Sequence, residues 1–283
     1  MVLNFLKILF LTLIISLHGH AQLFLVEEAC ACQSGQVDAF EFPKKFNFGK
    51  LKGQCIDSCR FRNLEMLEAN SEEIFIANIL HEGKFWKAKV TKAFSSVEMG
   101  FENFAPSVDH VFLKFQMSEG SAVTLFHLED SFLSPKFETK EIKTLVLSIE
   151  GVPAKGSRYS LIDAFFGNYL VAYRLLSAED AHKHMVIKQK NPVSFYPLQF
   201  KSDEILGIFE KSMSEANKFG FKQPYDLLSN NCATSAFALL PTSDKFSKVW
   251  YKKFFVEMAI PLSIHFPFST KYALRQLGYM TIY

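Results

Sequence analysis

The middle of the chain is divided by its apolar residues into a series of predicted β-strands. Residues 108–117 show the clearest pattern, because every second position from Val111 to Met117 is apolar. The other segments are rich in Ile, Phe, Val and Leu and are bounded by turn residues such as His81-Glu82-Gly83-Lys84. The predicted strands are residues 73–80, 86–94, 108–117, 122–129, 142–150 and 169–176.

Helical patterns follow these strands. A short helix is expected over residues 161–166, ended by Gly167. A longer one begins at Ser202 or Asp203, carries apolar residues at helical spacing, and ends at Gly220. A last helix begins about Asn231 and ends at Pro241. Strands first and a helix late indicate an α+β domain.

The N-terminus has the features of a secretory signal peptide. Lys7 precedes a short apolar run from Ile8 to Leu17, and Gly19 and Ala21 form a small-x-small pair. We expect cleavage after Ala21, which makes residues 1–21 the signal peptide, with retention as an anchor as the alternative. Either way the chain is expected to fold outside the cytosol.

The amino-acid composition limits the classes of molecule expected as partners. The chain has 31 basic and 29 acidic residues and a net charge of +2, without a long basic run, so nucleic acid is not expected as a partner. Phe is unusually frequent, at 31 of 283 residues. This frequency is explained either by a Phe-rich core or by an apolar cleft or membrane-docking surface.

The five cysteines fall into a group of four and a single residue. In an oxidising compartment we expect Cys30 and Cys32 to bond with Cys55 and Cys59, in either pairing, and a structural zinc site is the alternative. Cys232 is then unpaired, and a free thiol in such a compartment indicates either a buried inert residue or a used nucleophile.

The surroundings of Cys232 favour the nucleophile. Asn231 is a good N-cap, so Cys232 is expected in the first turn of a helix, where unpaired N–H groups and the helix dipole favour a thiolate and offer donors to an oxyanion. A thiolate also needs an imidazole. His110 begins the alternating strand 108–117 and is the preferred candidate.

An orienting partner for His110 is expected on the next strand. If Glu119-Gly120 is a two-residue hairpin loop, His110 faces Glu129 and Phe112 faces His127. This pairing makes His127 or Glu129 the third candidate, while His182 and His184 are expected in solvent.

The order of these motifs resembles the circularly permuted papain-like thiol enzymes, an NlpC-type fold with an antiparallel sheet and a late Cys-bearing helix. The segment from Pro106 to Leu240, and above all Tyr225-Asp-Leu-Leu-Ser-Asn-Asn-Cys-Ala-Thr, is similar to the bacterial Lnb-type lipoprotein N-acyltransferase family. The four-cysteine segment has no counterpart in the family pattern.

This resemblance implies a Cys–His acyltransferase, with Cys232, His110 and His127 as site residues. It would move a fatty acyl chain from a phospholipid or other glycerolipid, through a thioester, to the N-terminal amine of an apolipoprotein. The resemblance also implies that the enzyme needs no cofactor and that it works in the periplasm, at the outer face of the inner membrane. The alternatives are a peptidoglycan or peptide hydrolase with the same pair, and a non-catalytic envelope binding protein.

The expected organisation has four parts. After the signal peptide come residues 22–104 with the cysteine group and first strands, and residues 105–240 as the catalytic domain. Residues 241–283 are rich in Phe, with Pro261 and Pro267 excluding one continuous spanning helix. Basic residues beside these aromatics indicate a segment that lies on a membrane surface, or one that packs on its own domain.

Overall fold

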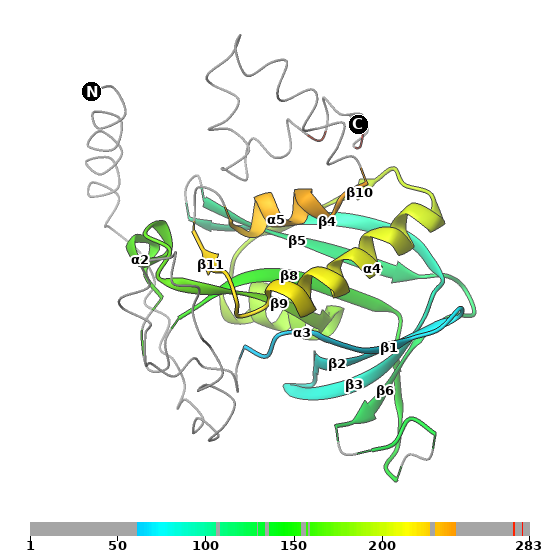
Figure 1. The fold of residues 1–283 in the computed structure, drawn as a ribbon. Helices are drawn as coiled ribbons and strands as arrows, with labels where there is room; N and C mark the ends of the chain where they lie inside the picture. The colour runs from blue at the N-terminus through cyan, green and yellow to red at the C-terminus, as the bar shows by residue number, and fades with distance from the viewer. Residues whose placement is uncertain are drawn as a thin grey trace, which may run out of the picture.

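The computed structural model describes residues 61–105, 108–128, 130–133, 136–153, 157, 159–226, 230–241, 274 and 279 (Figure 1). The predicted signal peptide, the cysteines at 30, 32, 55 and 59, Glu129 and nearly all of the C-terminal segment lie outside these residues. The predictions made for them stay predictions.

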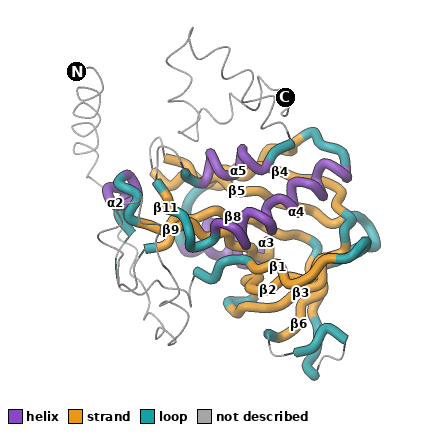
Figure 2. Tube along the Cα trace, in the orientation of Figure 1, coloured by secondary structure: helices purple, strands orange, loops and turns teal. Residues whose placement is uncertain are grey.

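Eleven strands and a few helices make up the described part of the chain, as the secondary-structure colouring in Figure 2 shows. The strands are β1 Glu65–Ala69, β2 Glu73–His81, β3 Lys84–Thr91, β4 Phe94–Ala105, β5 Val108–Met117, β6 Val123–His127, β7 Lys140–Ile142, β8 Thr144–Val152, β9 Tyr169–Ser177, β10 Val193–Leu198 and β11 Pro224–Tyr225. The helices are α2 Leu161–Phe165, α3 Ala178–His182, the π-helix η1 Lys183–Lys188, α4 Ser202–Phe219 and α5 Cys232–Leu239.

All described strands belong to one sheet, in the order β10-β4-β5-β8-β9-β2-β3-β6-β7, with β1 on β2 and β11 on β9. Each pairing is antiparallel except β2 with β9. Strands from both sides of the expected boundary at residues 104 and 105 therefore share this sheet. The mixed α+β class and the late Cys-bearing helix are confirmed, and the circularly permuted papain-like arrangement stays a prediction.

The predicted strands are found, but one predicted pairing is wrong. Strand β5 pairs with β4 and β8, whereas β6 pairs with β3 and β7. Residues 118–121 therefore connect two strands that are not neighbours, and His110 does not face Glu129 across a hairpin. Its partner in the register is Glu102 of β4.

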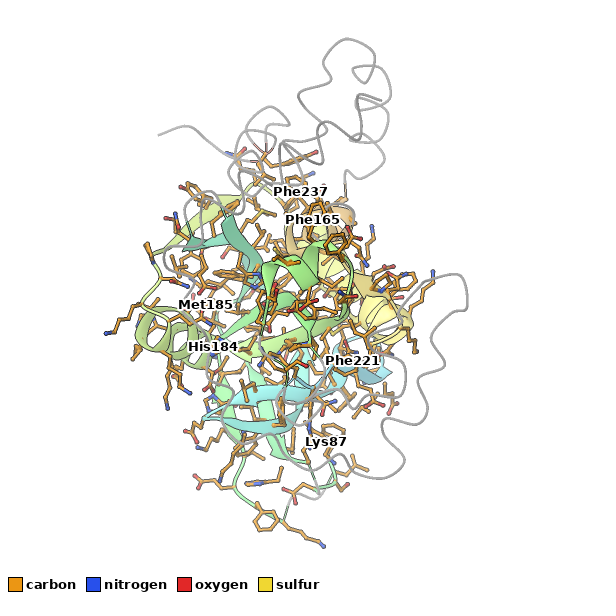
Figure 3. The ribbon with its side chains drawn as sticks, turned by 90° about the vertical axis from the view of Figure 1, so that its left-hand side faces the viewer. Lys87, Phe165, His184, Met185, Phe221 and Phe237 are labelled. Carbon is orange, nitrogen blue, oxygen red and sulfur yellow. The ribbon has the colours of Figure 1, made fainter. Side chains whose placement is uncertain are left out.

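Successive side chains on the central strands point to opposite faces of the sheet and form two separate apolar clusters. On β5, Val111 and Leu113 belong to the main core, together with the apolar faces of α4 and α5, while Phe112 belongs to a smaller cluster with Met185 of η1. Helices α4 and α5 cover one face of the sheet and α3 lies behind it (Figure 1). His184 and Met185 accordingly lie on one side of the molecule and Phe221 on the other (Figure 3).

Two residues of the C-terminal segment pack on this domain. Leu274 is buried in the main core, and the ring of Tyr279 stacks on Phe200. Among the described residues no helix has the length and apolar character needed to cross a membrane.

Candidate active site

The nucleophile candidate Cys232 is the first residue of α5, as the sequence predicts. Asn231 caps the helix, because its side-chain oxygen accepts the N–H groups of Ala233 at 2.9 Å and Thr234 at 3.0 Å. Thr234 completes a capping box by accepting the N–H of Asn231. These bonds fix the start of the helix and thereby the position of the Cys232 side chain.

Three groups surround the Cys232 sulfur, two from β5 and one from β11. The imidazole of His110 is hydrogen-bonded to it, and the backbone N–H of Val111 donates to it at 3.5 Å. The Tyr225 hydroxyl is also hydrogen-bonded to the sulfur, and its oxygen lies 3.5 Å from the Cys232 nitrogen. The start of β5, the end of β11 and the start of α5 therefore converge on one thiol that is 6% exposed.

Behind His110 a chain of polar groups runs across β8 to β9. His110 Nε2 lies 2.7 Å from Ser148 Oγ, and Ser148 Oγ donates to Glu150 Oε1 at 2.8 Å. Arg174 Nη1 donates to the other carboxylate oxygen of Glu150, also at 2.7 Å. Because Ser148 holds Nε2, the ring nitrogen left for the Cys232 thiol is Nδ1.

The charges of this arrangement favour a thiolate–imidazolium pair. Burial raises the pKa of the Cys232 thiol, but the charge and hydrogen bond of His110 outweigh burial and hold that pKa below its ordinary value of 9.0. Burial lowers the pKa of His110, but the charge of Cys232, followed by Glu102 and Glu150, raises it from 6.5 to about 9. Each member of the pair thus stabilises the charged form of the other.

Glu150 supplies the buried negative charge behind the pair. Burial raises the pKa of its carboxyl, yet the charges of Arg174, His110 and His184 lower that pKa to about 2. The ion pair with Arg174 is largely buried, since the two side chains are 18% and 7% exposed. Glu150 is therefore ionised at neutral pH.

A second buried carboxylate, Glu102, lies opposite His110 on β4. Its Oε1 accepts a hydrogen bond from Asn191 at 2.8 Å, and burial raises its pKa above the ordinary value of 4.5. His184, expected in solvent from the sequence, is hydrogen-bonded to Gln189 at 2.9 Å. Its charge contributes to the lowered pKa of Glu150. The face of the sheet behind His110 is thus lined by ionisable groups.

The described histidines other than His110 and His184 lie elsewhere. His127, the expected third site residue, packs between two aromatic rings. The centroid of its imidazole ring lies 4.5 Å from the ring centroid of Trp86 and 4.8 Å from that of Phe137. Because β5 and β6 are not paired, the hairpin that was to bring His127 to His110 is absent. In the structure the contact that orients His110 is made by Ser148. His182 is exposed on α3.

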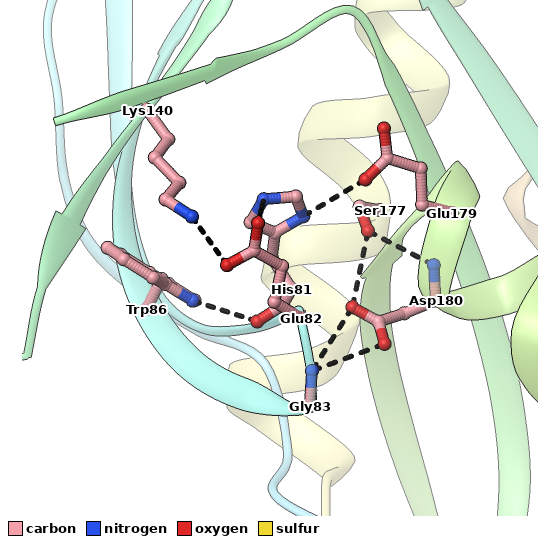
Figure 4. A network of polar contacts seen from close by, with 8 residues as sticks. All are labelled: His81, Glu82, Gly83, Trp86, Lys140, Ser177, Glu179 and Asp180. Atoms are coloured by element: carbon pink, nitrogen blue, oxygen red, sulfur yellow. Dashed lines mark hydrogen bonds and ion pairs between the residues drawn. The ribbon is translucent and has the colours of Figure 1, made fainter.

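His81 belongs to a separate polar cluster (Figure 4). It is 4% exposed, and its Nδ1 and Nε2 lie 3.9 and 3.8 Å from carboxylate oxygens of Glu179 and Glu82. Its backbone oxygen accepts the indole N–H of Trp86 at 2.9 Å. No set of three or more His, Cys, Asp or Glu side chains among the described residues is arranged to hold a metal ion.

Comparison with known proteins gives one match. A family profile described as the Lnb N-terminal periplasmic domain matches residues 99–257, which is more than half of the chain. The match includes His110, Ser148, Glu150, Tyr225 and Cys232. No curated protein and no solved structure matches the chain.

Proposed function

Because the chain belongs to the Lnb N-terminal periplasmic domain family, we propose that it is a periplasmic thiol acyltransferase with Cys232 as nucleophile and His110 as acid and base. The observation that carries the proposal is the hydrogen-bonded pair of Cys232 and His110, held from behind by Ser148 and Glu150. A thiolate beside an imidazolium is the arrangement that acyl transfer through a thioester requires.

The first half of the proposed reaction forms the thioester. The Cys232 thiolate attacks the ester carbonyl carbon of a glycerolipid, an S–C bond forms, and the carbonyl electron pair moves to oxygen. When this intermediate collapses, the C–O bond breaks and the leaving alkoxide takes the proton of the His110 imidazolium. The products are an acyl-thioester on Cys232, a lyso-glycerolipid and a neutral imidazole.

The second half regenerates the pair. The N-terminal amine of an apolipoprotein attacks the thioester carbonyl, and neutral His110 takes the proton that the amine loses. The C–S bond then breaks, which leaves an amide on the acceptor and the thiolate–imidazolium pair on the enzyme. Glu150 supports both halves because it stabilises the imidazolium through Ser148 whenever His110 carries the proton.

We place this reaction at the outer face of the inner membrane, where glycerolipid and apolipoprotein meet. Export by the predicted signal peptide and the periplasmic description of the family support this location.

The test is a reconstitution with the three components separated. Purified protein is mixed with phospholipid vesicles and a synthetic peptide that begins with a diacylglyceryl-cysteine and has a free amine. We expect the peptide to gain one acyl amide with wild-type protein and not with Cys232→Ala. Release of free fatty acid without acylated peptide, or cleavage of peptidoglycan fragments, would instead support the hydrolase.

A further inference from the structure

The start of α5 offers fewer backbone donors to an oxyanion than its sequence suggests. The N–H groups of Ala233 and Thr234 both donate to the Asn231 side chain. Among the N–H groups at the start of α5, that of Cys232 is therefore the one left beside the sulfur, and it faces the Tyr225 hydroxyl oxygen at 3.5 Å. The N–H of Val111 donates to the sulfur itself. An attacked carbonyl oxygen held at the start of α5 therefore has one donor from this helix and needs a second.

Tyr225 is fixed firmly at this position. Its strand β11 pairs with β9, which sets Tyr225 opposite Tyr169. Its ring lies directly against the backbone of Gly151, where a Cβ atom would approach Tyr225 Cδ1 to 2.8 Å. The side chain is 4% exposed. The strand pairing and the contact with Gly151 hold the ring so that its hydroxyl lies beside the thiol.

The hydroxyl is a permanent donor. Burial, followed by the charges of Cys232 and Tyr159, raises the pKa of the Tyr225 phenol well above its ordinary value of 10.0. The phenol thus keeps its proton beside a thiolate, and it donates that proton in a hydrogen bond to the sulfur.

We propose that Tyr225 is a catalytic residue whose hydroxyl, with the N–H of Cys232, forms the oxyanion site. In the resting enzyme the hydroxyl donates to the negative sulfur. When the sulfur attacks a carbonyl, its charge passes to the carbonyl oxygen, and the O–H turns from sulfur to that oxygen. No proton is transferred in this step, so the phenol stays neutral throughout. The inference rests on attack by Cys232 on a carbonyl, as the proposed function requires, whatever the acceptor.

The experiment compares two reactions of the same thiol. Acylation by p-nitrophenyl butyrate passes through an oxyanion, whereas alkylation by iodoacetamide does not. Both rates are measured against pH for the wild-type chain and for Tyr225→Phe, on the plateau where the thiol is fully ionised. Tyr173→Phe is the matched control, since it removes another buried phenol of the same core.

We expect Tyr225→Phe to lower the acylation plateau about 100–1,000-fold, the effect of removing one oxyanion donor, and to leave the alkylation plateau unchanged. The pH at which alkylation reaches half of its plateau should also rise, because the thiolate loses a donor. Tyr173→Phe should change neither plateau.

Equal changes in the two plateaus, including no change in either, would overturn the inference, because the hydroxyl would then act on the thiol or the fold alone. A wild-type thiol that is alkylated but never acylated by the ester would overturn it as well. Selective loss of acylation together with failure to acylate the lipopeptide would leave Tyr225 as the oxyanion donor and remove only the proposed acceptor.

Discussion

Removing the Ser148 hydroxyl tests whether the groups behind His110 control its proton. Ser148 is buried and joins His110 Nε2 to Glu150 through bonds of 2.7 and 2.8 Å. A hydrogen bond to a charged group contributes about 1.5–3 kcal/mol, and one pKa unit corresponds to about 1.4 kcal/mol. Ser148→Ala should therefore lower the pKa of His110 by about 1–2 units from its value of about 9.

The assay follows acyl transfer to the lipopeptide against pH for Ser148→Ala and for Ser212→Ala. Ser212 is a matched control because its buried hydroxyl donates to the Phe209 carbonyl within α4. We expect Ser148→Ala to reduce transfer about 10–100-fold, since the imidazole loses both orientation and charge stabilisation. The alkaline limit of activity should move to lower pH, and the control should retain both rate and limit.

A different ranking of variants would refute this reasoning. If Ser148→Ala kept the wild-type rate and pH profile while His127→Ala abolished transfer, the orienting residue would be His127, as the sequence suggests. The contacts of His127 with Trp86 and Phe137 predict instead that His127→Ala retains activity.

Further predictions concern His110, Glu150 and Cys232. Because the pKa of His110 is raised to about 9, acyl transfer should decline above that pH, where His110 no longer carries the proton that the leaving group needs. Alkylation of Cys232 should not decline there, and parallel pH profiles of the two reactions would contradict the assignment. Glu150→Gln should destabilise the fold by about 3–5 kcal/mol at pH 7 by leaving Arg174 buried without its partner, as measured by urea unfolding. Since the pKa of Glu150 is lowered from 4.5 to about 2, its stabilising effect is complete above pH 4.5 and is lost as the pH falls towards 2. The difference in free energy of unfolding between wild type and Glu150→Gln should therefore shrink across that range, and a constant difference would count against the ion pair. Mass mapping without reductant should find Cys232 free, and a disulfide at Cys232 would remove the nucleophile.

Local pattern was sufficient to predict the helix that carries Cys232 and six of the eleven described strands, whereas β1, β4, β7, β10 and β11 were not predicted. Strand β5 has the predicted bounds Val108–Met117 because alternation specifies a strand with two different faces. The start of α5 follows from Asn231, whose side chain satisfies two otherwise free N–H groups. Cys232 at the first helical position was therefore predictable from a few neighbouring residues.

Strand partners were not predictable, because they depend on contacts far apart in sequence. The turn at Gly120 has the composition of a hairpin, yet the chain leaving it pairs with β3, more than thirty residues earlier. Of the two neighbours of β5, β8 is almost wholly apolar, whereas β4 mixes apolar and polar residues and was not predicted as a strand. The local sequence of β5 does not indicate that it pairs with these strands and not with β6. Because β5 pairs with β8 and not with β6, the residue that holds His110 is Ser148 and not His127.

The sequence does contain a signal for the buried network of Ser148, Glu150 and Arg174. Ser148 and Glu150 are polar residues two positions apart in a strand that is otherwise almost wholly apolar, and Arg174 interrupts the apolar strand β9 in the same way. A buried polar side chain is costly unless it is paired. Such residues on neighbouring strands therefore indicate a buried polar network.

The central claim is that Cys232 carries the acyl group. The direct measurement is intact-protein mass spectrometry, followed by peptide mapping, of the purified chain after incubation with a phospholipid of one defined acyl composition and no acceptor. The account predicts a mass increase of one acyl chain, located on the Cys232 peptide, removed by neutral hydroxylamine and absent in His110→Ala over the same time. An unmodified Cys232, or an acyl group found on another residue and unaffected by Cys232→Ala, would contradict it.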